Sequence, residues 1–188
     1  MALSLETWSW IELAALWIAW AYPYAFRAPH VQKRESITVA GPTRIGLALE
    51  TASVVMALLP GAATPRTSPL ALLAAFVAGI AGAVLAWTAV QHLGRQFRVH
   101  AGLYVDHELV SSGPYSIVRH PIYASVLALL VTTIILRTSW KMAVAALVVF
   151  VIGTEIRVKS EEKLLASRFG PKFFAYKKRV FAYVPFIR

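Results

Sequence analysis

The sequence predicts an all-α integral membrane protein with about five transmembrane helices. Hydrophobic residues make up 58% of the 188 residues and charged residues only 15%, and both fractions depart from those of soluble proteins. Five apolar segments each approach the ~20 residues that a helix needs to cross about 30 Å of hydrocarbon. Lysine and arginine also collect on one side when these segments are threaded through a bilayer.

Short polar connections separate the five apolar segments. The expected spans are residues 8–26, 45–60, 69–90, 122–136 and 140–156. The third contains the sequence AGIAGAVLA, in which Gly79 and Gly82 lie among alanines. Small residues let neighbouring backbones approach closely in lipid, where the hydrophobic effect does not drive helices together. We therefore expect the third span to pack closely against its neighbours.

The fourth and fifth spans are predicted to form a helical hairpin near the carboxyl terminus. Only residues 137–139 separate them, which is a connection short enough to make them antiparallel neighbours. The hairpin returns Arg119 and His120, ahead of the fourth span, to the membrane face that carries Arg157 and Glu161 after the fifth. We expect a polar site where these residues converge.

The distribution of basic residues predicts the orientation of the spans. One membrane side carries 16 lysines and arginines and the other carries 3. By the positive-inside rule the amino terminus lies outside and the carboxyl terminus is cytoplasmic. The net charge of +10 is then mainly a topology signal that also attracts anionic lipid headgroups, by about 1 kcal/mol per basic residue near the surface. Nucleic acid is the weaker interpretation, and we expect none to bind.

Composition excludes several chemistries. The chain has no cysteine, so disulfides, thiolate nucleophiles and cysteine-ligated metals are ruled out, and we predict no metal site. No internal repeat is present. We expect a single membrane domain over residues 1–188, with membrane lipids as its surroundings and no obligate protein partner.

The most informative stretch is HELVSSGPYSIVRHPIY, residues 107–123, a polar loop with two prolines between two apolar segments. After the fifth span, Arg157 and Glu161 are four residues apart and share one helix face, while Glu162 lies about 100° around the helix. Two carboxylates and an arginine near a histidine and two tyrosines are suited to a polar cofactor at the membrane boundary. The bilayer would supply an apolar substrate.

Structural explanations compete with this functional one. An arginine and a glutamate at this spacing often form a solvated ion pair worth about 0.3 kcal/mol. A histidine before proline, as at His120 and Pro121, also occurs at helix starts, where proline suits the first turn and restricts the preceding residue.

These residues resemble the isoprenylcysteine carboxyl methyltransferase family, membrane enzymes that use S-adenosylmethionine. The resemblance rests on the loop 107–123, on EIRVKSEEKLLASRFGPKFFAYKKRV after one helical hairpin, and on a closing PFI. It covers about residues 87–188, starting with LGRQF, and the first two spans add nothing to it. The family often has proline after KRV, where this chain has Phe181. The resemblance implies a cytoplasmic cofactor pocket.

The resemblance also implies roles for individual residues. Arg157 matches the family arginine that holds the acceptor carboxylate, and we take Arg157 and Glu161 as the candidate catalytic residues. The implied cofactor-binding residues are His107, Leu109, Val110, Gly113, Tyr115, Arg119, His120, Tyr123 and Glu162.

The implied activity is methyl transfer from S-adenosylmethionine to a lipophilic acceptor that enters from the bilayer. The acceptor group would be the carboxylate of an isoprenylcysteine-like or other lipidic acid. N-methylation of a phospholipid or lipid amine is the alternative, with Glu161, Glu162 or His120 as candidate base, and an NADPH-dependent membrane reductase is a further one. We expect the protein in a bacterial or archaeal inner membrane.

Overall fold

The computed structural model describes residues 3–26, 36–38, 41–59, 68–98, 102–104 and 106–187. Within them the chain is mostly helical, as predicted. The six α-helices are α1 Leu5–Phe26, α2 Gly41–Leu58, α3 Pro69–Leu93, α4 Pro121–Arg137, α5 Trp140–Phe169 and α6 Pro171–Arg179. Two short 3-10 helices are η1 Gly94–Gln96 and η2 Gly113–Ser116, and a small antiparallel ribbon pairs β1 Ser36–Thr38 with β2 Gly102–Tyr104. This ribbon was not predicted from the sequence.

Helices α1 to α5 coincide with the five predicted spans, and α5 continues well beyond the predicted hydrocarbon boundary at residue 156. Among the described residues, one helical stretch is long and apolar enough to cross a membrane: Pro69–Gln96, which has 28 residues and an 18-residue window with a mean hydropathy of 2.3. Helix α4, Pro121–Arg137, is a shorter apolar helix. The crossing of a bilayer by all five helices stays a prediction.

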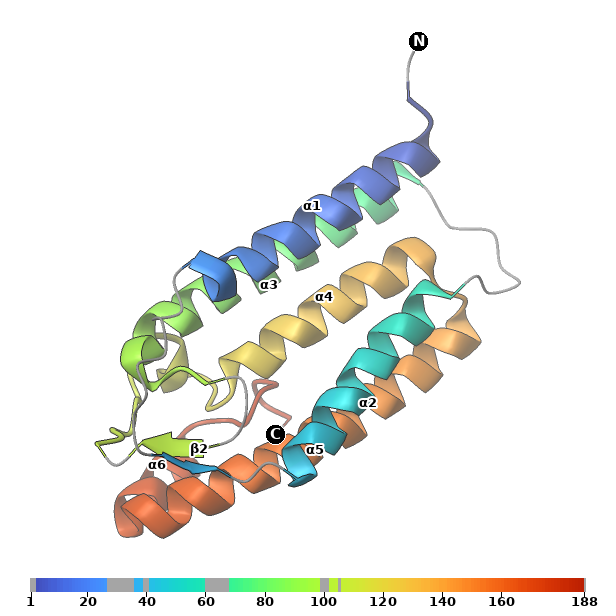
Figure 1. Cartoon of the computed structure of the whole chain (residues 1–188). Helices are drawn as coiled ribbons and strands as arrows, with labels where there is room; N and C mark the ends of the chain where they lie inside the picture. Colours follow the sequence, from blue (N-terminus) through green and yellow to red (C-terminus); the bar gives the residue numbers. More distant parts are fainter. Residues whose placement is uncertain are drawn as a thin grey trace.

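The hairpin of α4 and α5 opens away from its turn. Figure 1 shows the two helices diverging from the connection at 138–139, with α6, the ribbon and the chain end at the wide side. Each helix packs mainly on another one, α4 on α3 and α5 on α2. The predicted hairpin is therefore present, but space for a site lies between its arms.

Glycines bring these helix pairs together. An added Cβ at Gly79 would lie 2.5 Å from Leu16 of α1, and one at Gly82 would lie 2.6 Å from Leu129 of α4. One at Gly153 of α5 would lie 2.7 Å from the carbonyl oxygen of Gly46 in α2. The predicted close packing of the third span is confirmed, and α2 with α5 uses the same device.

The chain end is tied to the residues that precede α4. The backbone amide of Arg119 donates to the Phe181 carbonyl at 2.7 Å, and that of His120 donates to the Ala182 carbonyl at 2.8 Å. The hydroxyl of Tyr183 donates to Glu155 of α5 at 3.0 Å. The first two contacts use only backbone groups, so they do not require a proline at position 181, and Phe181 accepts the hydrogen bond through its carbonyl.

Candidate active site

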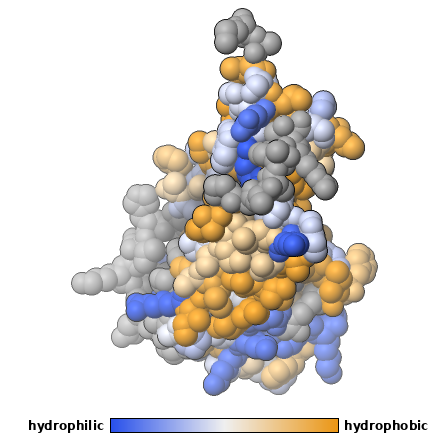
Figure 2. All heavy atoms as spheres, turned by 90° about the vertical axis from the view of Figure 1, so that its right-hand side faces the viewer, coloured by the Kyte–Doolittle hydropathy of each residue, from blue (hydrophilic) through white to orange (hydrophobic). Residues whose placement is uncertain are grey.

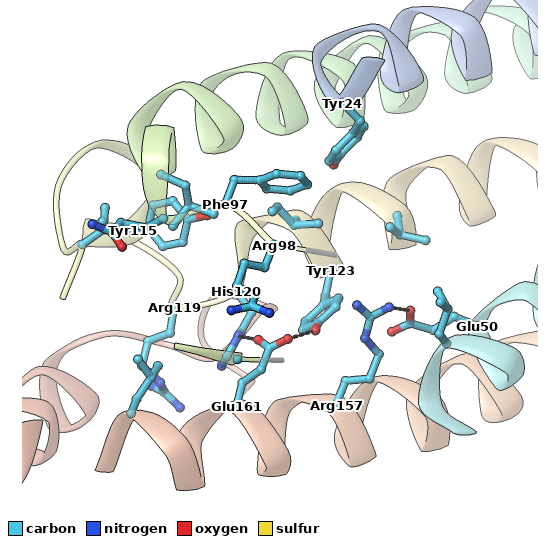
Figure 3. A pocket seen from close by; sticks show the side chains of 18 of the residues that line it. Tyr24, Glu50, Phe97, Arg98, Tyr115, Arg119, His120, Tyr123, Arg157 and Glu161 are labelled. Carbon is cyan, nitrogen blue, oxygen red and sulfur yellow. Dashed lines mark hydrogen bonds and ion pairs between the residues drawn. The ribbon is translucent and has the colours of Figure 1, made fainter. Parts of the chain in front are cut away.

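A cavity of about 590 Å³ lies between the diverging arms of the hairpin and extends to α1 and α2. Figure 3 shows side chains from α1, α2, α4, α5 and the loops pointing into it. The cavity brings together nine of the eleven predicted site residues. They are His107, Leu109, Val110, Tyr115, Arg119, His120, Tyr123, Arg157 and Glu161. Their roles stay predictions.

The Glu161 carboxylate is the centre of the polar end. It accepts a short hydrogen bond from the Tyr123 hydroxyl and lies 3.2 Å from Nδ1 of His120. Burial would raise the pKa of Glu161, but the bonds from His120 and Tyr123 and the charge of Arg157 outweigh burial and lower it. Glu161 is therefore a fixed negative charge on the cavity wall at neutral pH.

His120 is buried directly beside this carboxylate. Burial would lower the pKa of the imidazole, but Glu161 and Glu162 outweigh burial and raise it above its usual value. Its Nε2 lies 3.6 Å from Glu162, beyond hydrogen-bond distance. His120 therefore holds a proton more tightly than a free imidazole does, and its protonated form partly neutralises the two carboxylates.

Glu162 does not line the cavity, although we predicted it as a cofactor-binding residue. Its carboxylate accepts from Arg119 at 2.7 Å and from Lys177 at 2.6 Å, and Arg119 also donates to the Val180 carbonyl. These contacts join α5, α6 and the segment before α4. Because Glu162 is about 100° around the helix from Glu161, its side chain leaves the cavity and braces its wall.

Gly113 also lies outside the cavity lining. It begins the 3-10 turn η2 with a φ of +57°, a conformation that favours glycine, and a Cβ there would collide with the ring of His92. The turn places Tyr115 in the cavity wall, where its carbonyl accepts from the Tyr176 hydroxyl at 2.6 Å. Gly113 therefore shapes the loop and is not among the residues that line the cavity, although we predicted it as a cofactor-binding residue.

Arg157 lies at the other side of Tyr123 from Glu161. Its guanidinium carbon is 4.8 Å from the centre of the Tyr123 ring, and its Nη1 is 2.7 Å from Oε2 of Glu50 in α2. The four residues form a continuous row, visible in Figure 3, from Glu50 through Arg157 and Tyr123 to Glu161. Among the described contacts, Arg157 forms its ion pair with Glu50 and not with Glu161. The interpretation of Arg157 and Glu161 as a solvated ion pair is therefore wrong.

The part of the cavity that α1 lines together with Leu47 and Val54 of α2 is apolar and aromatic. Trp17, Trp20 and Tyr24 of α1 face Leu47 and Val54 of α2 across it. The indole N–H groups of the tryptophans donate to hydroxyls on α4, at 3.2 Å to Thr133 and 2.9 Å to Ser125. Because these polar groups are satisfied, the rings can present apolar surface to the cavity.

Sequence reasoning missed several residues of the site. Glu50, Trp17, Trp20, Tyr24, Gln96, Phe97 and Arg98 all line the cavity. Glu50 could have been found from the sequence, because it is the one acidic residue of the second predicted span. An ionisable residue inside a span indicates a functional role or an ion partner. The α1 aromatics had no such signal, because aromatic residues are ordinary in membrane helices.

A helical protein whose cavity is charged at one end and apolar at the other has the arrangement of an enzyme that brings a polar cofactor to a lipophilic substrate. The chain belongs to the isoprenylcysteine carboxyl methyltransferase family, because the model of that family matches residues 72–167.

A curated relative supports this membership. The protein-S-isoprenylcysteine O-methyltransferase B of Arabidopsis thaliana is 35% identical to the chain over 111 residues. The match covers 57% of this chain and 56% of the relative, so the chain spans about half the length of the curated relative it matches.

The polar end of the cavity fits S-adenosylmethionine by its donor set. The Glu161 carboxylate offers negative charge for a sulfonium or ammonium group, Arg98 offers positive charge for a carboxylate, and Phe97 and Tyr115 offer rings for a nucleoside base. Among the described residues, the buried Oε1 of Gln96 has no hydrogen-bond partner. A buried acceptor of this kind is suited to an amino or hydroxyl group of a ligand.

The raised pKa of His120 predicts a pH dependence of stability. The imidazolium stabilises the fold below its unfolded pKa of about 6.5, and this contribution is lost as the pH rises through the raised folded value. The difference in unfolding midpoint between the unsubstituted protein and His120→Gln should therefore shrink as the pH rises from about 6 to about 9. Thermal unfolding in detergent measures it.

Tyr176→Phe is the control for this titration, because burial raises the pKa of Tyr176 to about 12 and the group does not titrate in the range. Its effect on the midpoint should be the same at each pH. A pH-independent effect of His120→Gln would contradict the assignment of an imidazolium.

Proposed function

We propose that this protein transfers the methyl group of S-adenosylmethionine to the carboxylate of a lipophilic acceptor of the isoprenylcysteine type. One observation carries the proposal: Glu161 and Arg157, one turn apart on α5, line the same cavity with opposite charges on either side of Tyr123. A cationic donor and an anionic acceptor would each find the complementary charge there. The name of the Arabidopsis relative agrees with this acceptor class.

At the donor end, Glu161 and His120 hold the charge and Tyr123 fixes the carboxylate. S-adenosylmethionine, when bound, supplies an activated methyl group on a sulfonium. Glu161, His120 and Tyr123 would hold the cofactor, which would supply its methyl group to the acceptor oxygen and keep the electron pair of the broken carbon–sulfur bond on sulfur. No proton moves, so the residues contribute alignment and the exclusion of water.

At the acceptor end, Arg157 would hold the carboxylate and the α1 aromatics would contact the hydrocarbon chain. The guanidinium is a planar fork that matches two carboxylate oxygens. Trp17 and Trp20 line the cavity together with Leu47 and Val54 of α2, so an acceptor can lie between α1 and α2. We infer that the lipid group enters from the bilayer at this side.

We further propose that α1 to α5 all span the membrane, with the amino terminus outside and the site at the cytoplasmic face. Large apolar side chains point outward along these helices, such as Ile18 at 70% exposed, Val77 at 60% and Val144 at 56%. Figure 2 shows hydrophobic side chains over much of the described surface on one face, with hydrophilic ones along its lower edge. Such a surface suits lipid better than water.

Single cysteines test this topology in a chain that has none of its own. Cysteines at Leu3 and at Ile187 should react with a membrane-impermeant maleimide from opposite sides of sealed vesicles, because five spans put the two ends on opposite faces. Reaction of both from one side would refute the proposed number of spans.

Ligand titration tests the proposed cofactor. S-adenosylhomocysteine should bind the purified protein in detergent, as measured by calorimetry, and NADPH should not. His120→Ala should weaken S-adenosylhomocysteine binding by several-fold to a hundredfold, the equivalent of ~1–3 kcal/mol for a buried polar contact. Binding of NADPH alone would favour the reductase alternative and overturn the proposal.

A further inference from the structure

The ion pair between Glu50 and Arg157 joins a helix inside the family match to a helix outside it. Arg157 lies within residues 72–167, which match the family, whereas Glu50 on α2 lies outside that match. The side chains are 2.7 Å apart at Nη1 and Oε2, only 10% and 5% exposed, and both line the cavity. The arginine that we assign to the acceptor thus has a counter-charge from a part of the chain that the family match leaves out.

The helix crossing fixes the position of this pair. A Cβ at Gly46 would lie 2.5 Å from Cγ of Arg157, and one at Gly153 would lie 3.1 Å from the backbone nitrogen of Glu50. The stem of Arg157 therefore lies directly on α2. Thr154, on the same face of α5, donates to Oε1 of Glu50 at 3.1 Å, so the second carboxylate oxygen is also held.

We propose that Glu50 is a positioning residue that sets how strongly Arg157 binds the acceptor carboxylate. This inference rests on the proposed function. Glu50 holds one nitrogen of the guanidinium and partly offsets its charge. An acceptor carboxylate then meets a fixed arginine whose attraction is reduced by a neighbouring anion.

A reduced attraction helps methyl transfer. A carboxylate held tightly by an unopposed cation in a region of low dielectric is a weaker nucleophile, because the negative charge that must attack the methyl group is stabilised before the reaction. With Glu50 present, Arg157 can orient the carboxylate at a smaller loss of reactivity. Glu50 contacts neither reactant in this account and acts through Arg157.

The test compares a prenylated cysteine acid with its methyl ester, a pair of probes that differ by the negative charge. Glu50→Gln keeps an oxygen that can accept from Arg157 and removes the charge. It should raise the affinity for the acid by about tenfold or more, because at an effective dielectric of about 20 two like charges even ~12 Å apart repel by an energy worth a factor of ten. It should leave the affinity for the ester unchanged. In turnover, both KM and kcat for the acid should fall.

Two variants separate charge from structure. Glu50→Asp keeps the charge, so its preference for acid over ester should stay within about twofold of the unsubstituted protein. Glu155→Gln removes a carboxylate two residues from Arg157 that bonds Tyr183 and is not among the cavity-lining residues. It should leave the acid preference unchanged. Retained binding of S-adenosylhomocysteine shows that each variant is folded. If Glu50→Gln does not fold, the acid preference of Glu50→Asp still tests the proposed role of Glu50.

Unchanged or weaker binding of the acid by folded Glu50→Gln, or an equal gain in Glu50→Asp, would overturn the role of Glu50. A different result would defeat the proposed function itself: an unsubstituted protein that binds the acid no better than the ester has no acceptor-carboxylate site. The two failures are therefore distinguishable in one set of titrations.

Discussion

Arg157→Lys is expected to lower single-turnover methyl transfer to an acid acceptor by on the order of a hundredfold, the cost of about 1 Å of misplacement at a reacting centre. Lysine keeps the positive charge that Glu50 needs but loses the planar fork that aligns two carboxylate oxygens. The affinity for S-adenosylhomocysteine should change little, because Glu161 and His120 lie on the other side of Tyr123 from Arg157.

Arg179→Lys is a matched control for Arg157→Lys. Arg179 is exposed in α6 and donates to the Ala175 carbonyl at 3.3 Å, so both turnover and donor affinity should stay within about twofold. Rapid-quench transfer from labelled donor measures the turnover. Unchanged transfer in Arg157→Lys would rule out an acid acceptor held by this residue and would favour a lipid amine instead.

Glu161→Gln is expected to weaken S-adenosylhomocysteine binding by ~10- to 100-fold, as a buried charge-assisted contact is lost. Two effects combine. The cavity loses the negative charge that faces the ligand's ammonium group, and His120 and Tyr123 lose the carboxylate that holds them in place. Calorimetry in detergent measures the affinity, and turnover at saturating donor shows what remains of the chemistry.

Glu162→Gln provides the comparison for Glu161→Gln. Glu162 is not among the cavity-lining residues, and it binds Arg119 and Lys177. Its substitution should therefore lower the unfolding midpoint and weaken donor binding less than Glu161→Gln does. Equal loss of donor affinity in the two variants would contradict the division between a cavity carboxylate and a bracing carboxylate.

The helices could be predicted from the sequence because apolar length alone identifies them. Segments 69–90 and 122–136 correspond closely to α3 and α4, since the length of the apolar run decides where a transmembrane helix begins and ends. The ribbon of β1 and β2 was missed. Each strand has three residues, too few for an alternating pattern to appear.

The spacing of the helices in the sequence did not predict which helices pack against each other. The short connection after Arg137 predicts α4 beside α5, yet Gly82 joins α4 to α3 and Gly153 joins α5 to α2. The importance of a glycine depends on what faces it, and that is a property of the fold. The opening of the hairpin, and with it the cavity, follows from these two crossings.

Some polar residues of the site could be predicted from the sequence and others could not. The loop 107–123 and the pair Arg157 and Glu161 were identified from motif and spacing, and the structure places them on one cavity. The ion partner of Arg157 was not identified, because Glu50 is 107 residues away in the chain. Local spacing favoured Glu161 as that partner, whereas burial against α2 decided for Glu50.

The chemical nature of the methylated product tests the central claim most directly. Purified protein in lipid is incubated with methyl-labelled S-adenosylmethionine and, separately, with a prenylated cysteine acid and with a lipid amine, and the product is treated with mild base. The account predicts label transfer to the acid alone, released by base as methanol from an ester. Base-stable label on the amine, or no transfer to the acid by protein that binds S-adenosylhomocysteine, would contradict it.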